Sequence, residues 1–268
     1  MREKLTDFSS AELVRANRAN LYEFFRSLED SSFMDFSRQD GLLRWSCPFQ
    51  YSWVNAVLCS RDATPQDGAF VDESLAYFRS RKTFEISWWL EDGVDLAGWQ
   101  DLLRPRGLKL EQGPPGMSMD LNMLKEMDNL PGVEIKIVRD RQSMQDCANA
   151  LIHGNGFPSD WEPIVFNFLA GIGWDGLYQI YVAYRNGRPV STAGVFLGRE
   201  VAGIYSVATI PAARGKGIGA AITQKPLLDA RKMGYRVGTM QSSEMGFPIY
   251  KKMGFKSDFH LGSFYAQL

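Results

Sequence analysis

The chain has 268 residues, of which 45% are hydrophobic and 23% are charged, and its formal net charge at pH 7 is −1. This composition predicts a globular protein of one large or two modest domains rather than a disordered chain, and the balanced charge argues against a large nucleic-acid surface. No apolar run reaches 18 residues and no basic start precedes an apolar stretch, so we expect neither a membrane span nor a secretory signal, and a cytoplasmic location.

Charge is unevenly distributed along the chain. Residues 1–130 carry 15 basic and 21 acidic side chains, whereas residues 131–268 carry 15 basic and 10 acidic ones. The second half is therefore the half that a phosphate-rich ligand would favour.

The cysteines and histidines are too few and too scattered for a metal site. Cys47, Cys59 and Cys147 form no Cys-x-x-Cys pair, and the two histidines are His153 and His260. This pattern favours buried thiols over a disulfide framework, and it predicts no metal.

The first half of the chain predicts alternating helices and strands. Ser9 or Ser10 can cap a helix over 10–28, in which apolar residues recur at helical spacing. We then expect strands over 42–47 and 52–59, a polar turn over 62–68, a helix over 71–81, a strand over 83–90 and a short helix over 99–103. Strands over 108–111 and 117–121 are expected to form a hairpin about the Gly-Pro-Pro-Gly sequence at 113–116.

The second half continues in the same manner. Its clearest local feature is Asn186-Gly187, which predicts a tight hairpin between strands over 178–184 and 189–197. The other expected elements are a strand over 133–138, helices over about 140–151 and 160–170 joined by a loop at 153–158, a strand over 201–209, a helix over 220–233, a strand over 235–241, a helix over 247–253, and strands from 255 and after Gly262.

A glycine-rich turn separates the strand over 201–209 from the following helix. It reads Arg214-Gly215-Lys216-Gly217-Ile218-Gly219, so several backbone N–H groups and two cations gather at the positive end of the helix dipole. This arrangement predicts a cradle for a diphosphate. The spacing fits neither the mononucleotide loop G-x-x-x-x-G-K-[ST] nor the dinucleotide pattern G-x-G-x-x-G.

The turn resembles the acetyl-CoA motif of the GNAT (GCN5-related N-acetyltransferase) superfamily. The resemblance lies in Arg214-x-x-Gly217-x-Gly219 after a strand that ends Val-Ala-Thr-x-Pro. Downstream, the stretch from Ser242 to Phe255, with Phe247-Pro248-Ile249-Tyr250 and a final Gly-Phe, is similar to the second signature of the family. The resemblance covers about residues 133–268. It implies an α+β fold in which helices flank a mixed, mostly antiparallel sheet.

A weaker pattern suggests an internal duplication. When Arg106-Gly107-Leu108-Lys109 is placed over Met253-Gly254-Phe255-Lys256, the predicted elements on both sides match in order. We therefore expect a tandem of two GNAT-like domains, one at 1–125 without the cofactor motif and a catalytic one at 131–268. Shared turn chemistry arising by chance is the alternative. Because residues 60–68 contain no R-x-x-G-x-G, we expect one cofactor site per chain.

The resemblance also assigns roles to single residues. It implies that the pantetheine arm pairs with the backbone of Val207, Ala208 and Thr209, and that Tyr250 protonates the departing CoA thiolate. The pyrophosphate would sit on the backbone N–H groups of Gly215, Lys216, Gly217, Ile218, Gly219 and Ala220, with Arg214 adjacent. Ser243 stands where relatives often carry an Asn that touches the cofactor, which leaves that contact open.

The general base is not evident from the sequence. Many relatives carry a Glu on the strand before the cradle, where this chain has Val201, Gly203 and Tyr205, and the nearest carboxylate is Glu200 at the edge of the strand. Water is one alternative acceptor of the amine proton. The others are His260, Asp175 and Glu244.

The acceptor substrate is also open. Phe157, Trp161 and Trp174 lie where relatives wall the acceptor pocket, and Trp88 and Trp89 could add an aromatic wall, although each of these side chains could equally be part of the core. An amino acid, an amine, an antibiotic and a peptide N-terminus all remain candidates.

These observations predict an acetyl-CoA-dependent N-acetyltransferase that moves the acyl group to a primary amine of a small molecule or peptide by direct attack in a ternary complex. The alternative is a non-catalytic acyl-CoA-binding sensor. An enzyme that acetylates charged transfer RNA fits poorly with the net charge. We expect no nucleic-acid or membrane partner, and a homodimer remains open.

Overall fold

The computed structural model describes residues 4–29, 31, 33–173 and 176–268. The chain forms two compact units: unit 1 comprises Met1–Leu28 and Pro114–Phe259, and unit 2 comprises Glu29–Gly113 and His260–Leu268. The boundaries of these units differ from those of the predicted domains at 1–125 and 131–268. The difference arises because the first helix belongs to unit 1, and because the long strands β5 (Lys109–Asp120) and β11 (Lys256–Gln267) each run through both units.

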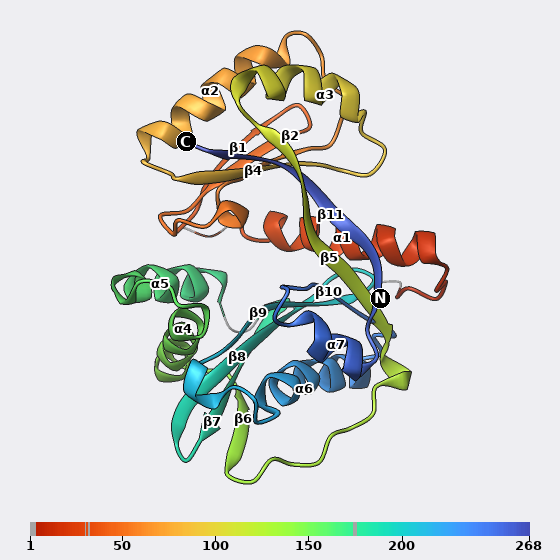
Figure 1. Ribbon diagram of the computed structural model, residues 1–268, viewed down its shortest axis with the longest axis vertical. Helices are drawn as coiled ribbons and strands as arrows, with labels where there is room; N and C mark the ends of the chain where they lie inside the picture. Colours follow the sequence, from red (N-terminus) through yellow and green to blue (C-terminus); the bar gives the residue numbers. More distant parts are fainter. Residues whose placement is uncertain (1–3, 30, 32, 174–175) are drawn as a thin grey trace. The chain divides into compact units, whose positions relative to one another are not determined.

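Unit 1 is built on a mixed sheet with the strand order β6-β7-β8-β9-β10-β5-β11. The strands β9 and β10 run parallel, whereas β6–β7, β7–β8, β8–β9 and β10–β5 are antiparallel pairs. The strands are β6 (Val133–Ile137), β7 (Tyr178–Arg185), β8 (Arg188–Leu197), β9 (Ala202–Thr209) and β10 (Val237–Gln241). The helices are α1 (Ser10–Arg26), α4 (Arg141–Asn155), α5 (Glu162–Ile172), α6 (Ile218–Lys232) and α7 (Phe247–Met253) (Figure 1).

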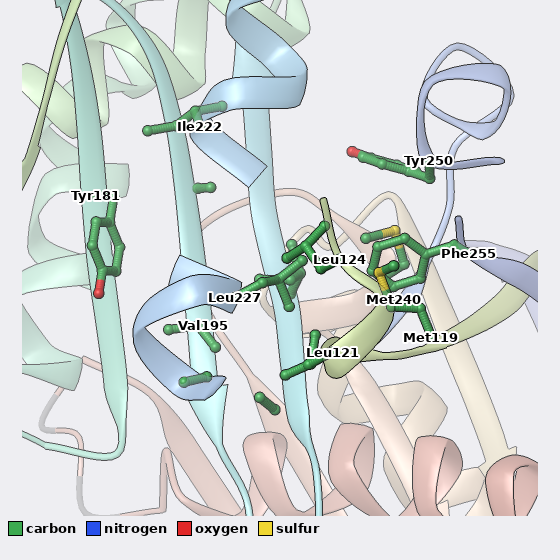
Figure 2. Packing of buried hydrophobic residues seen from close by; sticks show 14 of the residues in the cluster. Met119, Leu121, Leu124, Tyr181, Val195, Ile222, Leu227, Met240, Tyr250 and Phe255 are labelled. Atoms are coloured by element: carbon green, nitrogen blue, oxygen red, sulfur yellow. The ribbon is translucent and has the colours of Figure 1, made fainter. Parts of the chain in front are cut away.

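The main core of unit 1 lies between the sheet and α6. Ile222 and Leu227 of α6 pack with Val195 of β8 (Figure 2). Ile204 of β9 belongs to the same cluster, and all four side chains are almost fully buried. Burial of this apolar face supplies most of the stabilisation that holds α6, and with it the glycine-rich turn, in place.

Helix α1 is fixed to the sheet of unit 1 by two buried asparagines. The Asn17 Nδ2 donates to the Met117 carbonyl at 2.9 Å, and the Asn20 Nδ2 donates to the Val201 carbonyl at 3.0 Å. The Asn20 Oδ1 also accepts a hydrogen bond from the Tyr205 hydroxyl at 2.7 Å. Buried amides with these partners determine where the helix sits on the sheet.

Replacing Asn20→Ala is expected to lower the free energy of unfolding by about 2–3 kcal/mol, because it leaves a buried carbonyl and a buried hydroxyl without partners. Denaturant titration followed by circular dichroism measures the change. The control is Glu12→Ala on the same helix, which removes only a partly exposed ion pair with Arg15. A loss for Asn20→Ala no larger than that of the control would contradict the anchoring role.

Unit 2 has a second mixed sheet with the strand order β1-β2-β3-β4-β11-β5. Its strands β3 (Ala56–Cys59) and β4 (Glu85–Leu90) run parallel. The pairs β1–β2, β2–β3 and β4–β11 are antiparallel, with β1 spanning Asp35–Gln39 and β2 spanning Leu42–Ser46. Helices α2 (Asp67–Ser80) and α3 (Leu96–Leu103) cover a core that contains Phe78, Trp88, Trp99 and Phe264.

The two halves of the chain repeat one order of elements. The segment α2-β4-α3-β5 corresponds to α6-β10-α7-β11. Before the last strand of each segment stands a left-handed glycine: Gly107 (φ 91°) follows the 3₁₀ turn over Arg104–Arg106 that continues α3, and Gly254 (φ 107°) follows α7. In both places the next N–H bonds back to a carbonyl five residues earlier, from Leu108 to Leu103 and from Phe255 to Tyr250. Leu103 therefore stands in unit 2 where Tyr250 stands in unit 1.

The predicted hairpin about residues 113–116 is wrong, because β5 continues through this segment as one strand. Its glycines permit close packing instead of a turn. A Cβ added to Gly113 would lie 2.4 Å from the Leu261 carbonyl oxygen, and one added to Gly116 would lie 2.1 Å from the Phe259 ring. The expected break at Gly262 is likewise absent, since β11 runs on through that residue.

Three further differences concern the first hundred residues. Strand β1 was not predicted, although the Asp40-Gly41 turn that joins it to β2, with φ of 37° and 74°, is a recognisable hairpin sequence. The strand expected over 52–59 begins only at Ala56, after a 3₁₀ turn over Ser52–Val54. Helix α2 begins at Asp67 rather than at residue 71. None of the helices in the described residues is long and apolar enough to cross a membrane.

Candidate functional site

A gap opens where strands β9 and β10 diverge. The two strands pair over Ala202–Ile204 and Gly238–Met240. Just beyond this point β9 carries a bulge, because Tyr205 lies opposite Gly194 of β8 whereas Ala208 lies opposite Thr192. In the described part of the chain, Ala208 and Thr209 are therefore paired on one side only, with Thr192 and Ser191 of β8, and Val207 lies in the bulge.

The glycine-rich turn lies at the end of β9 and leads into α6. Gly215 (φ 72°) and Gly217 (φ 77°) adopt the left-handed conformation that favours glycine, and Gly217 is the N-cap of α6 without a capping side chain. An added Cβ on Gly219 would lie 3.4 Å from the Thr209 hydroxyl oxygen. The turn thus brings together the predicted cradle residues, with the N–H groups of Ile218, Gly219 and Ala220 in the first helical turn.

Arg214 and Lys216 hold the turn through backbone carbonyls. The Arg214 guanidinium donates to the Thr209 carbonyl at 3.1 Å and to the Gly154 carbonyl of α4 at 2.8 Å, and the Lys216 ammonium donates to the Ala212 carbonyl at 2.6 Å. Both cations therefore add positive charge beside the helix N-terminus and also fix its geometry.

Tyr250 of α7 lies on the same side of the sheet as α6. Its ring is 8% exposed, packs edge to face on Phe255, and reaches from α7 towards α6 (Figure 2). Burial raises the pKa of Tyr250 to about 12, while the hydroxyl of Thr223 acts in the opposite direction. Thr223 in turn donates to the Gly219 carbonyl at 2.8 Å, so the phenol lies beside a residue bonded to the first turn of α6.

Ser243 is exposed and shapes the start of α7. Its Oγ accepts a hydrogen bond from the Gly246 N–H at 3.2 Å, and its carbonyl accepts one from the Phe247 N–H at 2.9 Å. Through these bonds Ser243 caps the N-terminus of α7.

Comparison with known families identifies part of this arrangement. Residues 176–257, which span the gap, the cradle and Tyr250, match a family model described as an acetyltransferase (GNAT) domain. This segment belongs to the GNAT family. A search of curated protein sequences with this chain finds no match.

Solved structures extend the likeness to almost the whole chain. A GCN5-related N-acetyltransferase from Kribbella flavida shares 16% identity over 97% of this chain and 95% of its own, with a TM-score of 0.63. One from Sphaerobacter thermophilus shares 14% identity over 96% and 91%, with a TM-score of 0.61. A Drosophila protein shares 15% identity over 99% of each chain, with a TM-score of 0.55. At these identities the likeness shows the fold, a tandem of two GNAT-like halves.

Helix α1 covers two of the strand positions, Gly203 and Tyr205, at which the resemblance described above implies a Glu. A Cβ added to Gly203 would lie 1.9 Å from the Asn20 Oδ1, and the Tyr205 hydroxyl is bonded to the same amide. Glu200 is held in an ion pair with Arg15 of α1 at 2.9 Å. The strand positions themselves carry no carboxylate, and the nearest one, on Glu200, is paired with Arg15.

The other candidate bases are dispersed. His260 belongs to unit 2, where its Nδ1 lies 3.2 Å from the Gly113 carbonyl oxygen, and Glu244 is exposed after β10. Asp175 and Trp174 lie outside the described residues.

The predicted aromatic residues fall into two groups. Phe157 and Trp161 follow α4 in unit 1, with ring centroids 5.7 Å apart. Trp88 and Trp89 are buried in unit 2, where the Trp88 indole N–H donates to the Cys59 Sγ at 3.0 Å and Trp89 packs on Trp45. Packing within unit 2 accounts for both of the latter residues.

The three thiols are buried, as predicted. Burial raises the pKa of Cys47 and of Cys147 to about 12, and raises that of Cys59 further above its usual value. Among the described residues, no three His, Cys, Asp or Glu side chains gather to hold a metal ion.

In unit 2 the counterpart of the cradle is occupied by the chain itself. The Asp67 carboxylate in the first turn of α2 accepts two bonds from Arg61, each of 2.8 Å, and one from the Thr64 N–H at 2.7 Å. The Arg61 guanidinium lowers the pKa of Asp67 to about 2. A fixed carboxylate at this helix N-terminus would repel a diphosphate.

A cavity of about 890 Å³ lies beside α6 and α7 in unit 1. It borders the cradle at Ala220 of α6 and is lined by apolar side chains, among them Met119, Met123, Met127 and Met253. Lys125 and Lys252 are among its polar lining residues.

Two contacts near the ends of β9 and β10 could not be predicted from the sequence. The Gln241 amide at the end of β10 donates to the Asn17 Oδ1 at 2.6 Å, while its buried Oε1 has no hydrogen-bond partner in the described part of the protein. Tyr178 of β7 donates from its hydroxyl to the Ser206 Oγ at 2.9 Å. Both contacts join segments far apart in sequence, and no local pattern indicates them.

Proposed function

We propose that the protein is an acyl-CoA-dependent N-acyltransferase that moves an acetyl group from acetyl-CoA to a primary amine of a small molecule or peptide. The observation that carries this proposal is the uncapped first turn of α6 beside the gap between β9 and β10, within a GNAT domain. Backbone N–H groups at a helix N-terminus suit a diphosphate.

The residues around the gap fit such a substrate. The unpaired edge of Val207, Ala208 and Thr209 can pair with the amides of a pantetheine arm, and the buried Gln241 Oε1 lacks a donor that an amide N–H would supply. The pyrophosphate would rest on the N–H groups from Gly215 to Ala220. The adenosine end would extend towards the cavity that borders Ala220.

Acyl transfer then needs one proton delivered and one removed. The neutral amine nitrogen attacks the thioester carbonyl carbon, the C–S bond breaks, and the Tyr250 hydroxyl gives its proton to the departing sulfur. A phenol whose pKa burial raises to about 12 remains protonated at neutral pH and is ready to act as the acid. The ammonium formed on attack loses its proton to water, since α1 covers the strand positions of a Glu base.

An acyl-CoA sensor without catalysis is the second candidate. The observation that favours it is the contact of Asn20 with Gly203 and Tyr205, which replaces a strand carboxylate.

Two measurements separate these functions. Calorimetry with acetyl-CoA should give one site per chain, because Asp67 fills the counterpart in unit 2. Release of CoA in the presence of a panel of amines can be followed with a thiol reagent, because the protein's own thiols are buried and protonated. Binding without CoA release on a broad panel would favour the sensor, and absence of binding would overturn both.

A further inference from the structure

Ser206 adopts an unusual backbone conformation in the bulge of β9. Its φ is 53°, in the left-handed region that serine seldom enters, and it lies two residues after Ile204, where the pairing of β9 with β10 ends. Strain of this kind persists when the surroundings enforce it, and it is concentrated at functional sites.

Tyr178 fixes the Ser206 side chain from the neighbouring strands. The buried Tyr178 hydroxyl donates to the Ser206 Oγ at 2.9 Å, and its ring lies so close over Gly194 that an added Cβ would be 2.0 Å from the hydroxyl oxygen. Because Tyr178 is the donor in this bond, the Ser206 hydroxyl proton is free to be donated elsewhere. A hydroxyl that accepts one hydrogen bond is also a stronger donor of the next.

Helix α1 covers the residues that surround Ser206 on this face of the sheet. Phe24 stacks on Tyr205 at 4.5 Å and packs on Tyr178 at 5.0 Å, while Asn20 fills the space above Gly203. Ser206 is half-buried and comes next along β9, so it is the first polar side chain of the strand beyond the α1 contact.

We infer that the Ser206 hydroxyl donates a hydrogen bond to the carbonyl oxygen of the acyl thioester, and that Tyr178 is the positioning residue that orients it. This inference rests on the proposed function. As the amine attacks, negative charge develops on that oxygen, and when the C–S bond breaks the charge passes to sulfur. Ser206 keeps its proton throughout. A pre-oriented donor of this kind lowers the barrier without entering the proton balance.

The test compares Ser206→Gly and Ser206→Ala with the wild-type chain, using acetyl-CoA and an acceptor from the amine panel. Both variants remove the hydroxyl, and both should lower kcat by about 10²-fold with the KM for acetyl-CoA little changed. Glycine accepts a φ of 53° and alanine does not, so the melting temperature should be maintained in Ser206→Gly and reduced in Ser206→Ala. An equal loss of kcat with unequal stability cannot come from a merely structural role.

Tyr178→Phe should lower kcat by a smaller factor, about tenfold, since the Ser206 hydroxyl remains but is no longer oriented. Tyr184→Phe is the matched control on the same strand, because its hydroxyl bonds to Asp146 and not to the bulge. If the wild-type chain turns over acetyl-CoA and Ser206→Gly has the same kcat, this inference alone is overturned. Failure of the wild-type chain to bind acetyl-CoA would overturn the proposed function and this inference together.

Discussion

Replacing Tyr250→Phe should lower kcat by about 10²-fold while leaving the affinity for acetyl-CoA unchanged. The ring would still pack on Phe255 and against α6, so the fold and the cradle are preserved, and only the proton for the departing thiolate is lost. Steady-state kinetics with an acceptor amine, together with calorimetry for binding, measures both quantities.

The pH profile gives an independent check on Tyr250. Because burial raises the pKa of this phenol to about 12, it holds its proton throughout the neutral and mildly alkaline range. Loss of this proton should therefore not reduce the wild-type kcat in that range. The control variant is Tyr181→Phe, whose hydroxyl bonds to Asp229 on α6, and its kcat should equal that of the wild type. A near-normal kcat in Tyr250→Phe would contradict this role and would indicate that water protonates the departing thiolate.

Replacing Gly217→Asp should weaken acetyl-CoA binding by on the order of 10²-fold. The new carboxylate would stand at the N-cap of α6, where the dipole and the N–H groups attract negative charge, and would repel the pyrophosphate. Calorimetry measures the dissociation constant.

The matched control is Gly217→Asn. Asparagine has the shape of aspartate and tolerates the left-handed φ of 77°, but carries no charge, so its effect should be clearly smaller. Equal affinities in the two variants would place the diphosphate elsewhere. Arg214→Glu is a less clean test, because Arg214 also links the turn to Gly154 of α4 and a loss of binding could follow from a loosened fold.

Local signals in the sequence predicted much of the fold and the place of the glycine-rich turn in it. Asn186-Gly187 forms the tight turn expected of it, with φ of 51° and 76°, and α7 spans the predicted residues 247–253. The glycines at 215 and 217 lie at the start of a helix, as their pattern indicated. In each case the controlling interaction lies within a few residues.

Interactions between distant segments could not be predicted in this way. Gly113 and Gly116 resemble turn glycines in sequence, but they are needed because β11 passes close by. Asn20 is separated by 185 residues from Tyr205, and nothing in its own helix indicates that its amide contacts Gly203 and Tyr205 of β9. The contact between Tyr178 and Ser206 is hidden for the same reason.

The passage of β5 and β11 through both units has a consequence for the order of events on the ribosome. Residues 29–113 are made early, yet the strand that pairs with β4 comes from 264–267, which is synthesised after the other strands of both units. Until then the edge of β4 is an open template for pairing with another chain. Unit 2 therefore cannot complete its sheet before the whole of unit 1 has been translated, contrary to the usual N-terminal-first order. A nonsense mutation near residue 260 would consequently damage unit 2, which lacks the cradle, because its sheet would be without the strand that pairs with β4.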